Sequence, residues 1–588
     1  MKQSPHSSHA LRRRFFILSV CVLTLILLIR IAYLQLIKHQ FYKHKSETQV
    51  KRIIKLYSKR GHIFDRNKQP LALTQKAYSV YALPKQIENK WVFAKKIAGI
   101  LNVPRKEISD MLYQTKAPFV WIKRQCNIET SLALKKLNLK GIGFIQTEKR
   151  VYPEPTLASP ILGFVGIDNQ GLGGLEYKYD KELKGTSGKI ILEGDPRGKQ
   201  LLSGKRKLKP PFDGQHIYTT IDRYTQFIAQ YYLEKGVLEN QAKSGSVIVM
   251  DPKTGDIHAM ASFPHFNNNQ WQLAPRESKK NPCVTDVYEP GSIFKIITLA
   301  SVLEEEIVSP KTTLYVPETL TLYNRTITEA HPRKEGDPDS LSVSEIIQQS
   351  LNVGTSLLAI KLGEERFYKY IQSFGFGKRT DIQLPGESKG LLRPLQNWSG
   401  VDIATISFGQ GIAVTPIQMI SAVATIANEG VYVKPRVIHY FSDPKHDSQK
   451  TVPIQKKGPI ISKKTAAQVS DILEKVVQRG TGKPAAIPGY KIAGKTGTSQ
   501  KARADGKGYA AGEYIASFIG FFPVSDPKFL IYVTVDTPKK SIWGSSVAAP
   551  IFRNIALGLI DYANIKPEKY TKRQKRTKLS SDDLSLVN

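Results

Sequence analysis

The segment Glu289-Pro290-Gly291-Ser292-Ile293-Phe294-Lys295 decides how the rest of this sequence is interpreted. Pro-Gly is typical of a turn, and the apolar residues that follow it begin a predicted helix. Ser292 would lie in the first turn of that helix, with Lys295 one turn later on the same face. A partly desolvated lysine loses proton affinity, so its neutral amine could accept the proton of the serine hydroxyl. The segment therefore predicts a serine nucleophile beside a lysine base.

Taken alone, this Ser-x-x-Lys pattern is a weak signal. Ser442-x-x-Lys445 and Ser525-x-x-Lys528 match it as well, and both are expected to be solvated turns. The interpretation therefore depends on whether other motifs accompany the pattern.

A second signal is Ser350-Leu351-Asn352, within a helical stretch predicted over residues 344–362. A hydroxyl and an amide two residues apart can point into one cleft, where the hydroxyl relays a proton and the amide holds substrate. The alternative is an ordinary polar pair at a helix break or cap.

A third signal, Gly494-Lys495-Thr496-Gly497-Thr498-Ser499, follows a strand predicted at residues 490–493. A cation and two hydroxyls beside Gly497, which has no side chain, suit a strand edge that receives a substrate backbone and its carboxylate. The alternative is a turn, because the same tripeptide occurs at Lys253-Thr254-Gly255 in a predicted hairpin loop.

Strand-like segments flank these motifs at both ends of the region, with helical stretches between them. Together, the first and last segments predict an antiparallel sheet, and the middle segments supply helices, which gives an α+β domain. The predicted strands are residues 246–250, 257–261, 490–493, 515–522 and 529–535, and the predicted helices include 292–305 and 344–362.

Composition restricts the partners and cofactors. The chain has 588 residues, 41% of them apolar, which suits two or three folded units. Its formal net charge of +36 fits either a solvated lysine-rich surface or attraction to an anionic neighbour. Cys21, Cys126 and Cys283 are too few for a disulfide framework. The histidines are scattered, so neither a metal site nor a cofactor is indicated.

The N-terminus predicts a membrane anchor. Arg12, Arg13 and Arg14 precede an apolar run over residues 15–37 that contains Arg30 near its far end. About 20 residues cross the hydrocarbon core, and the leading arginines favour a cytoplasmic N-terminus. The alternative is a cleaved signal peptide, but no small-x-small cleavage site follows the run. A chain anchored in this way lies mostly outside the cytoplasm, which argues against nucleic acid as its partner.

In their order and spacing, the three motifs resemble those of the serine penicillin-recognising enzymes, which pair Ser-x-x-Lys with Ser-x-Asn and Lys-Thr-Gly. Further segments resemble class B penicillin-binding proteins, and the matches span residues 12–555. Leu351 is a departure, because the division-specific subgroup, septal penicillin-binding protein 3, more often has a second serine there. The matching segments are Arg60-Gly61-x-Ile63-x-Asp65-Arg66-Asn67, Arg150-Val151-Tyr152-Pro153, Gly174-Leu175-Glu176, Asp195-Pro196-Arg197-Gly198, Gly409-Gln410-Gly411 and Thr415-Pro416-Ile417-Gln418. Ser407-Phe408-Gly409-Gln410-Gly411 and Val547-Ala548-Ala549-Pro550 are closer to the division-specific subgroup than to the elongation subgroup.

This resemblance implies a serine β-lactamase/DD-peptidase-like transpeptidase domain, an antiparallel sheet flanked by helices, behind an elongated mixed α/β pedestal. The expected organisation is a cytoplasmic tail at 1–14, a transmembrane helix at 15–37, a non-catalytic, dimerisation-like pedestal at 38–240, a penicillin-binding transpeptidase domain at 241–560, and a basic disordered tail at 561–588.

The resemblance also implies roles for the motif residues. Ser292 would attack the carbonyl between the last two D-alanines of a stem peptide, with Lys295 as general base and Ser350 relaying a proton. The backbone amides of Ser292 and Thr498 would form the oxyanion hole. Substrate would be held by Asn352, Lys495, Thr496, Gly497 and Thr498, without any cofactor. β-Lactams would acylate Ser292 as mimics of the donor.

The implied function is peptidoglycan D,D-transpeptidation during septal wall synthesis at the inner membrane, with the catalytic domain in the periplasm. The implied partners are stem peptides on lipid-linked nascent glycan, a membrane glycan polymerase and other division proteins. An elongation-type transpeptidase and a D-Ala-D-Ala carboxypeptidase remain alternatives. A β-lactamase is disfavoured because no Glu-x-x-Leu-Asn signature follows the second motif. From another class, the chain could be a non-catalytic division scaffold or a β-lactam sensor, although few residues precede the anchor for cytoplasmic signalling.

Overall fold

The computed structural model describes residues 6–193, 206–331, 333, 336, 338–503 and 508–568. The chain divides into two compact units, one formed by Met1–Lys59 with Gly185–Gly214 and the other by Arg60–Lys184 with Gln215–Asn588. The turn expected at residues 195–198 lies outside the described residues. The part of the expected tail from residue 569 onward lies outside them as well.

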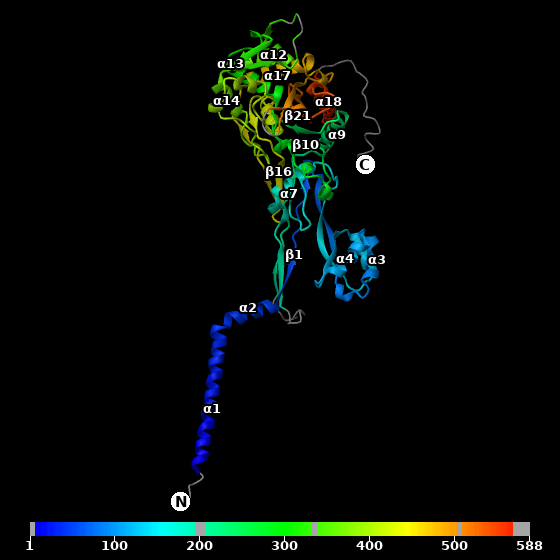
Figure 1. Ribbon diagram of the computed structural model, residues 1–588, viewed down its shortest axis with the longest axis vertical. Helices are drawn as coiled ribbons and strands as arrows, with labels where there is room; N and C mark the ends of the chain where they lie inside the picture. Colours follow the sequence, from blue (N-terminus) through cyan, green and yellow to red (C-terminus); the bar gives the residue numbers. More distant parts are fainter. Residues whose placement is uncertain are drawn as a thin grey trace. The chain divides into compact units, whose positions relative to one another are not determined.

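The first unit contains the apolar N-terminal helix. Helix α1 (His6–Ala32) continues through a π-helical turn, η1 (Tyr33–Ile37), and is the long blue helix of Figure 1. Ala10–Ile37 is the one helix among the described residues that is long and apolar enough to cross a membrane, which is consistent with a single-pass anchor. The unit is completed by α2 (His39–Val50) and an antiparallel sheet in the order β1 (Lys51–Leu56), β6 (Gly188–Glu193), β7 (Arg206–Lys209).

The second unit is built around a five-stranded antiparallel sheet. Its strand order is β10 (Ile257–Phe263), β9 (Ser244–Met250), β21 (Phe529–Asp536), β20 (Tyr509–Phe522) and β19 (Ala493–Ala502). The first and last strand segments of residues 241–560 therefore pair with each other, and the predicted α+β class is confirmed.

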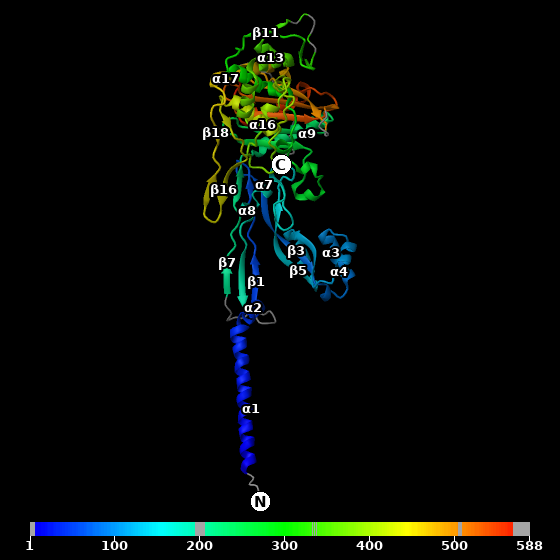
Figure 2. The same ribbon diagram turned by 60° about the vertical axis from the view of Figure 1, so that its left-hand side comes forward.

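Both faces of this sheet are buried. Val247 and Val249 of β9 pack into one core with α9 (Arg223–Glu239) and α18 (Gly544–Tyr562), whereas Ile248 and Met250 pack into the other. Double burial explains why β9 is an unbroken apolar run rather than an alternating one. Figures 1 and 2 show α9 and α18 beside the sheet.

The middle of the sequence supplies the helices and a small hairpin. The helices are α10 (Pro282–Thr285), η5 (Gly291–Phe294), α11 (Lys295–Glu304), α12 (Val343–Gln349), α13 (Asn352–Leu362), α14 (Glu364–Ser373), α15 (Asp402–Ser407), α16 (Pro416–Ala427), α17 (Lys463–Arg479) and η7 (Lys483–Ala485). The short strands are β11 (Thr313–Tyr315) paired with β14 (Ser340–Ser342), β12 (Thr319–Leu322) paired with β13 (Arg325–Thr328), and β15 (Tyr432–Val433) paired with β18 (Lys456–Lys457).

A second sheet of the same unit joins distant parts of the sequence. Its order is β17 (Ser448–Thr451), β16 (Ile438–Asp443), β8 (His216–Thr219), β2 (Ile63–Phe64), β3 (Pro70–Ala82) and β4 (Val120–Cys126), and β5 (Ile142–Val151) also pairs with β3. Strand β8 runs parallel to β2 and antiparallel to β16. This sheet is therefore not contained within residues 38–240, because residues 438–451 form one end of it.

Three helices, α3 (Lys90–Leu101), α4 (Arg105–Gln114) and α5 (Ile128–Lys136), form a separate small core with β3, β4 and β5. Cys126 belongs to this core and Cys283 to the main core, and both are free, buried thiols. The short helices α6 (Ser159–Leu162), α7 (Gly174–Lys178) and α8 (Asp180–Lys184) follow β5 along the chain.

The N-terminal motif segments meet in a buried charge network. Glu176 accepts hydrogen bonds from Arg60 Nε at 2.7 Å and from Arg150 Nε at 2.6 Å, and all three side chains are almost wholly buried. Tyr152 donates its hydroxyl to the same carboxylate at 3.2 Å. A buried carboxylate needs such partners, so these segments hold the fold together.

Three sequence predictions differ from the structure. The strand predicted at residues 490–493 begins only at Ala493 and continues to Ala502, because pairing with β20 extends it through the Lys-Thr-Gly motif. The helix predicted at 344–362 is broken at Ser350, whose backbone has the left-handed conformation. Helix α18 extends to Tyr562, and Glu568 donates its backbone N–H to Gly489, so the tail expected from 561 overlaps packed chain.

Candidate active site

Ser292 lies in the 3₁₀ turn η5, which packs against β19. Gly291 has φ +56° and donates its N–H to the carbonyl of Gly409 at 3.1 Å. A Cβ at Gly291 would lie 3.0 Å from the carbonyl oxygen of Thr498, so this close approach favours glycine. On the other side of Ser292, the Ile293 side chain lies 2.8 Å from where a Cβ at Gly497 would be. The half-buried Ser292 is thus held beside the Lys-Thr-Gly strand.

Lys295 begins helix α11 and is fully buried. It lies three positions after Ser292, which places both on one face of the helix start. Its Nζ donates to the backbone oxygen of Ser350 at 2.5 Å and to Asn352 Oδ1 at 2.8 Å, and it lies 3.5 Å from Ser350 Oγ. The left-handed conformation of Ser350 (φ 62°) turns its carbonyl and hydroxyl toward the same amine.

Lys495, on β19, reaches the same place from the opposite wall. It is fully buried, and its Nζ donates to Ser350 Oγ at 2.7 Å and to the carbonyl of Thr496 at 3.2 Å. The structure therefore brings all three motif segments together around one serine hydroxyl.

Burial sets the electrostatics of the two lysines. Desolvation lowers the pKa of Lys295 to about 7, and the negative charge of Glu329 opposes this shift. The pKa of Lys495 is lowered well below its usual value by burial and by the positive charge of Lys295. A lysine with a pKa near neutrality can serve as a general base, because its uncharged amine is populated.

The remaining motif residues of β19 bond to neighbouring segments. Thr496 shares a hydrogen bond between hydroxyls with Thr481 at 2.9 Å, and Thr498 Oγ1 accepts the backbone N–H of Gly544 at 3.2 Å. A Cβ at Gly544 would lie 2.4 Å from the carbonyl of Gly497, so only glycine allows the start of α18 this close to the strand.

Glu289 connects the nucleophile turn to two other segments. Its carboxylate accepts the N–H of Gly411 and the hydroxyl of Tyr509, both at 2.9 Å. Burial raises the pKa of Glu289. Because Gly411 belongs to the Gly-Gln-Gly segment, this contact gives that segment a role in supporting the turn.

Sequence reasoning did not identify Glu329, Thr481 or Gly544, which all contact motif residues. None of them belongs to a recognisable motif. One signal was available for Glu329: Leu351 precedes α13 as its N-cap and its side chain cannot accept a hydrogen bond, so the helix needs an acceptor from elsewhere.

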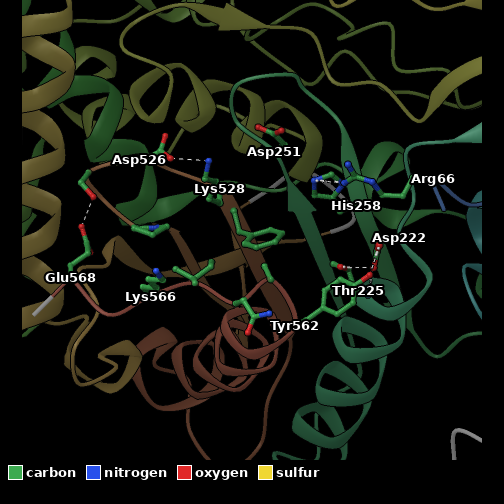
Figure 3. Close-up of a pocket in the computed structure, with 16 residues that line it drawn as sticks. Arg66, Asp222, Thr225, Asp251, His258, Asp526, Lys528, Tyr562, Lys566 and Glu568 are labelled. Atoms are coloured by element: carbon green, nitrogen blue, oxygen red, sulfur yellow. Dashed lines mark hydrogen bonds and ion pairs between the residues drawn. The ribbon is translucent and has the colours of Figure 1, made fainter. Parts of the chain in front are cut away.

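Figure 3 shows a different pocket, with a volume of about 500 Å³, whose lining includes Ser525 and Lys528. Ser525 donates to Glu568, and Lys528 pairs with Asp526 at 2.8 Å. The second Ser-x-x-Lys match is therefore a loop with separately bonded side chains, as expected from the sequence. Other polar groups in this pocket bond to one another too, as Figure 3 shows for Arg66 with His258 and for Asp222 with Thr225.

Comparison with known families covers most of the chain. Residues 245–557 match the penicillin binding protein transpeptidase domain, and residues 55–219 match the penicillin-binding protein dimerisation domain. Stage V sporulation protein D of Bacillus subtilis is 36% identical over 574 residues, which cover 96% of this chain and 88% of that protein. Peptidoglycan D,D-transpeptidase FtsI of Escherichia coli K12 is 31% identical over 587 residues, covering 97% and 95% respectively. Penicillin binding protein 3 of Mycobacterium tuberculosis, solved as a complex with aztreonam, has a TM-score of 0.69 at 28% identity and covers 88% of this chain and 98% of its own.

The five-stranded sheet, the clustered lysines and these matches define a serine peptidoglycan D,D-transpeptidase. Within that class, the chain belongs to the class B penicillin-binding proteins, which carry a dimerisation domain ahead of the transpeptidase domain.

Proposed function

We propose that this chain cross-links stem peptides in septal wall synthesis through an acyl-enzyme on Ser292. The observation that carries the proposal is the convergence on Ser350 Oγ, which lies 2.7 Å from Lys495 Nζ and 3.5 Å from Lys295 Nζ. A hydroxyl shared by two amines of lowered pKa can pass a proton in either direction.

In the acylation step, the neutral amine of Lys295 takes the proton of Ser292 Oγ as that oxygen attacks the carbonyl between the two terminal D-alanines. The backbone N–H groups of Ser292 and Thr498 would stabilise the oxyanion. As the peptide C–N bond breaks, Ser350 Oγ gives its proton to the departing amine and is reprotonated from the lysines. The products are an ester on Ser292 and free D-alanine.

The second half-reaction transfers the acyl group to the amine of a neighbouring stem peptide. Asn352 would steer the donor chain, while Lys495, Thr496, Gly497 and Thr498 would hold the terminal carboxylate along β19. A bound carboxylate would raise the proton affinity of Lys495, which makes the contact a charge-assisted hydrogen bond. β-Lactams would acylate Ser292 by the same route.

The proposed topology places residues 1–14 in the cytoplasm, 15–37 in the inner membrane and the rest in the periplasm. Residues 38–240 would serve as the pedestal, 241–560 as the transpeptidase domain and 561–588 as the tail. A membrane glycan polymerase and other division proteins would bind the pedestal. The leading arginines and the apolar span Ala10–Ile37 support this topology.

Labelling with a fluorescent penicillin tests the nucleophile. Ser292→Ala should abolish covalent labelling, whereas Ser525→Ala, in the matched Ser-x-x-Lys loop, should label like the wild type. Labelling that persists in Ser292→Ala would refute the mechanism.

Measuring free D-alanine against cross-linked dimer separates transpeptidation from the carboxypeptidase alternative. Normal division supported by Ser292→Ala would instead favour a scaffold.

The cellular role needs a separate test. Ser407-Phe408-Gly409-Gln410-Gly411 and Val547-Ala548-Ala549-Pro550 favour a septal enzyme. The relative named for stage V of sporulation favours a second candidate, wall synthesis confined to sporulation. A fluorescent fusion at the septum of dividing cells supports the first role. A signal on the side wall favours the elongation alternative, and one restricted to sporulating cells favours the second candidate.

A further inference from the structure

Glu329, directly after the hairpin strand β13, accepts two hydrogen bonds from the helix that carries Asn352. Its Oε2 accepts the backbone N–H of Asn352 at 2.5 Å, and its Oε1 accepts that of Val353 at 2.9 Å. These are the first two residues of α13, whose N–H groups have no partner within the helix. Because the N-cap residue is Leu351, whose side chain makes no capping bond, a carboxylate from another segment caps the helix.

Thr328, the residue before Glu329, holds the side chain of Asn352 in place. Its Nδ2 donates to the carbonyl of Thr328 at 3.0 Å, while its Oδ1 accepts from Lys295 Nζ at 2.8 Å. Thr328 and Glu329 together therefore hold both the backbone and the amide of Asn352. The amide is oriented with its oxygen toward the buried lysine, and the Ser350 turn is anchored beside it.

The segment of residues 328–331, which contains Thr328 and Glu329, also contacts the residues that support β19. The ring of His331 lies 3.9 Å from the ring of Trp543, measured between centroids. Trp543 precedes Gly544, whose N–H donates to Thr498 Oγ1. Residues 328–331 thus touch the Ser-x-Asn turn at one end and the support of the Lys-Thr-Gly strand at the other.

Glu329 is the charged group that opposes the effect of burial on Lys295, and the positive charge of Lys295 acts in turn on Lys495. Lys495 approaches from β19, and Glu329 approaches from β13 through the N-terminus of α13. The negative charge of Glu329 raises the pKa of Lys295 against the larger effect of burial. Removing that charge should let the pKa of Lys295 fall further.

We propose that Glu329 is a positioning residue for transpeptidation: it caps α13, holds Asn352 and the Ser350 turn against Lys295, and supplies a negative charge that acts on that buried amine. The proposal rests on the proposed function of Ser292 and Lys295. Glu329 does not touch the reacting atoms and acts through Asn352 and Lys295.

The test measures acylation by a fluorescent penicillin, with the full chain in detergent, for Glu329→Ala, Glu329→Gln and Glu329→Asp. Glu329→Ala should slow acylation by about 10- to 100-fold, because small displacements of reacting groups carry losses of that size. Glu329→Asp keeps the carboxylate and should recover most of the rate. Glu329→Gln removes the charge and keeps only one of the two acceptor oxygens, so the acid limb of its pH–rate profile should move to lower pH.

Glu345 provides a matched control. Its carboxylate accepts the N–H of Ser342 at 2.8 Å and caps α12, the helix that ends directly before Ser350. Glu345→Ala should cost stability without changing the acylation rate or its pH profile. If Glu345→Ala slows acylation as much as Glu329→Ala does, the effect is general helix disorder and the proposal is wrong.

Two further results would overturn the proposal: wild-type acylation rates in folded Glu329→Ala, or an unmoved pH profile in Glu329→Gln. If Glu329→Ala does not fold, the acylation rates and pH profiles of Glu329→Gln and Glu329→Asp test the proposal instead. Failure of the underlying function is distinguishable, because the wild type would then not label or Ser292→Ala would still label. Normal Ser292-dependent labelling with unaffected Glu329 variants would refute only the positioning role.

Discussion

Lys295 and Lys495 meet at one hydroxyl group, with their Nζ atoms 3.5 Å and 2.7 Å from Ser350 Oγ. Both lysines are fully buried, so two charged ammonium groups at this separation would repel each other strongly. The site therefore favours a state with at least one neutral amine. That state is what a serine nucleophile requires of its base.

Removing the shared hydroxyl should impair chemistry more than binding. Ser350→Ala should lower the rate of Ser292 acylation by about 10²- to 10⁴-fold, the usual contribution of positioned proton transfer. Stopped-flow kinetics that separate reversible β-lactam binding from acylation would measure this. Ser356→Ala is the control, because Ser356 is buried in α13, the helix that follows Ser350, and its hydroxyl donates to backbone oxygens of Asn352 and Ala404. Equal losses in both variants would contradict a relay role.

Acylation should increase with pH through about 7. Burial lowers the pKa of Lys295 from 10.5 to about 7, so the neutral base becomes dominant as pH rises through that value. Second-order rate constants for β-lactam acylation between pH 5.5 and 9 would show the rise, and circular dichroism at each pH would confirm that the fold is intact. A flat profile would show that Lys295 is not the titrating base.

A side chain at Gly409 should disrupt the nucleophile turn. Gly409 has φ +84°, and a Cβ there would lie 2.3 Å from the carbonyl oxygen of Gly291. Gly409→Ala should therefore lose covalent penicillin labelling and destabilise the protein by more than the ~1–2 kcal/mol of left-handed strain. Gly512→Ala separates the two effects, because Gly512 has φ +73° with nothing within 4 Å of its Cβ position. Similar results for both variants would contradict the steric explanation.

Neutralising Glu176 should weaken the second unit without touching the active site. Glu176→Gln leaves Arg150 without its carboxylate partner and Arg60 with Asp180 alone, which should cost about 3–5 kcal/mol in the free energy of unfolding. Denaturant unfolding would measure the loss. Glu88→Gln, in an exposed pair with Lys140, should change stability little. Equal stabilities of the two variants would rule out the buried network as a major contribution.

The apolar strands of the catalytic sheet could be predicted from the sequence, whereas the course of β19 through the Lys-Thr-Gly motif was only one of two alternatives. Residues 246–250, 515–522 and 529–535 are rich in β-branched and aromatic residues and all fall within β9, β20 and β21. The Gly-Lys-Thr-Gly stretch has turn-like composition, so only its pairing with β20 and its burial make it a strand. Strand β16, which pairs with the adjacent β17 and with the remote β8, was not predicted.

The site could be predicted as far as its motifs extend. Ser292, Lys295, Ser350, Asn352 and Lys495 were recognisable as a set, since their order and spacing are specific. Glu329 accepts hydrogen bonds from two backbone N–H groups at the start of α13. Every helix start has such N–H groups, so no motif or spacing in the sequence identifies the residue that accepts them. The contacts of Thr481 and Gly544 depend likewise on how distant elements pack.

The pairing of β16 with β8 also restricts when the fold can be completed during synthesis. Strands β2 and β8 are synthesised long before residue 438, so one sheet edge waits unpaired while more than two hundred residues follow. An exposed edge invites pairing with other chains. The order of synthesis therefore leaves this edge open to misassembly until β16 is made.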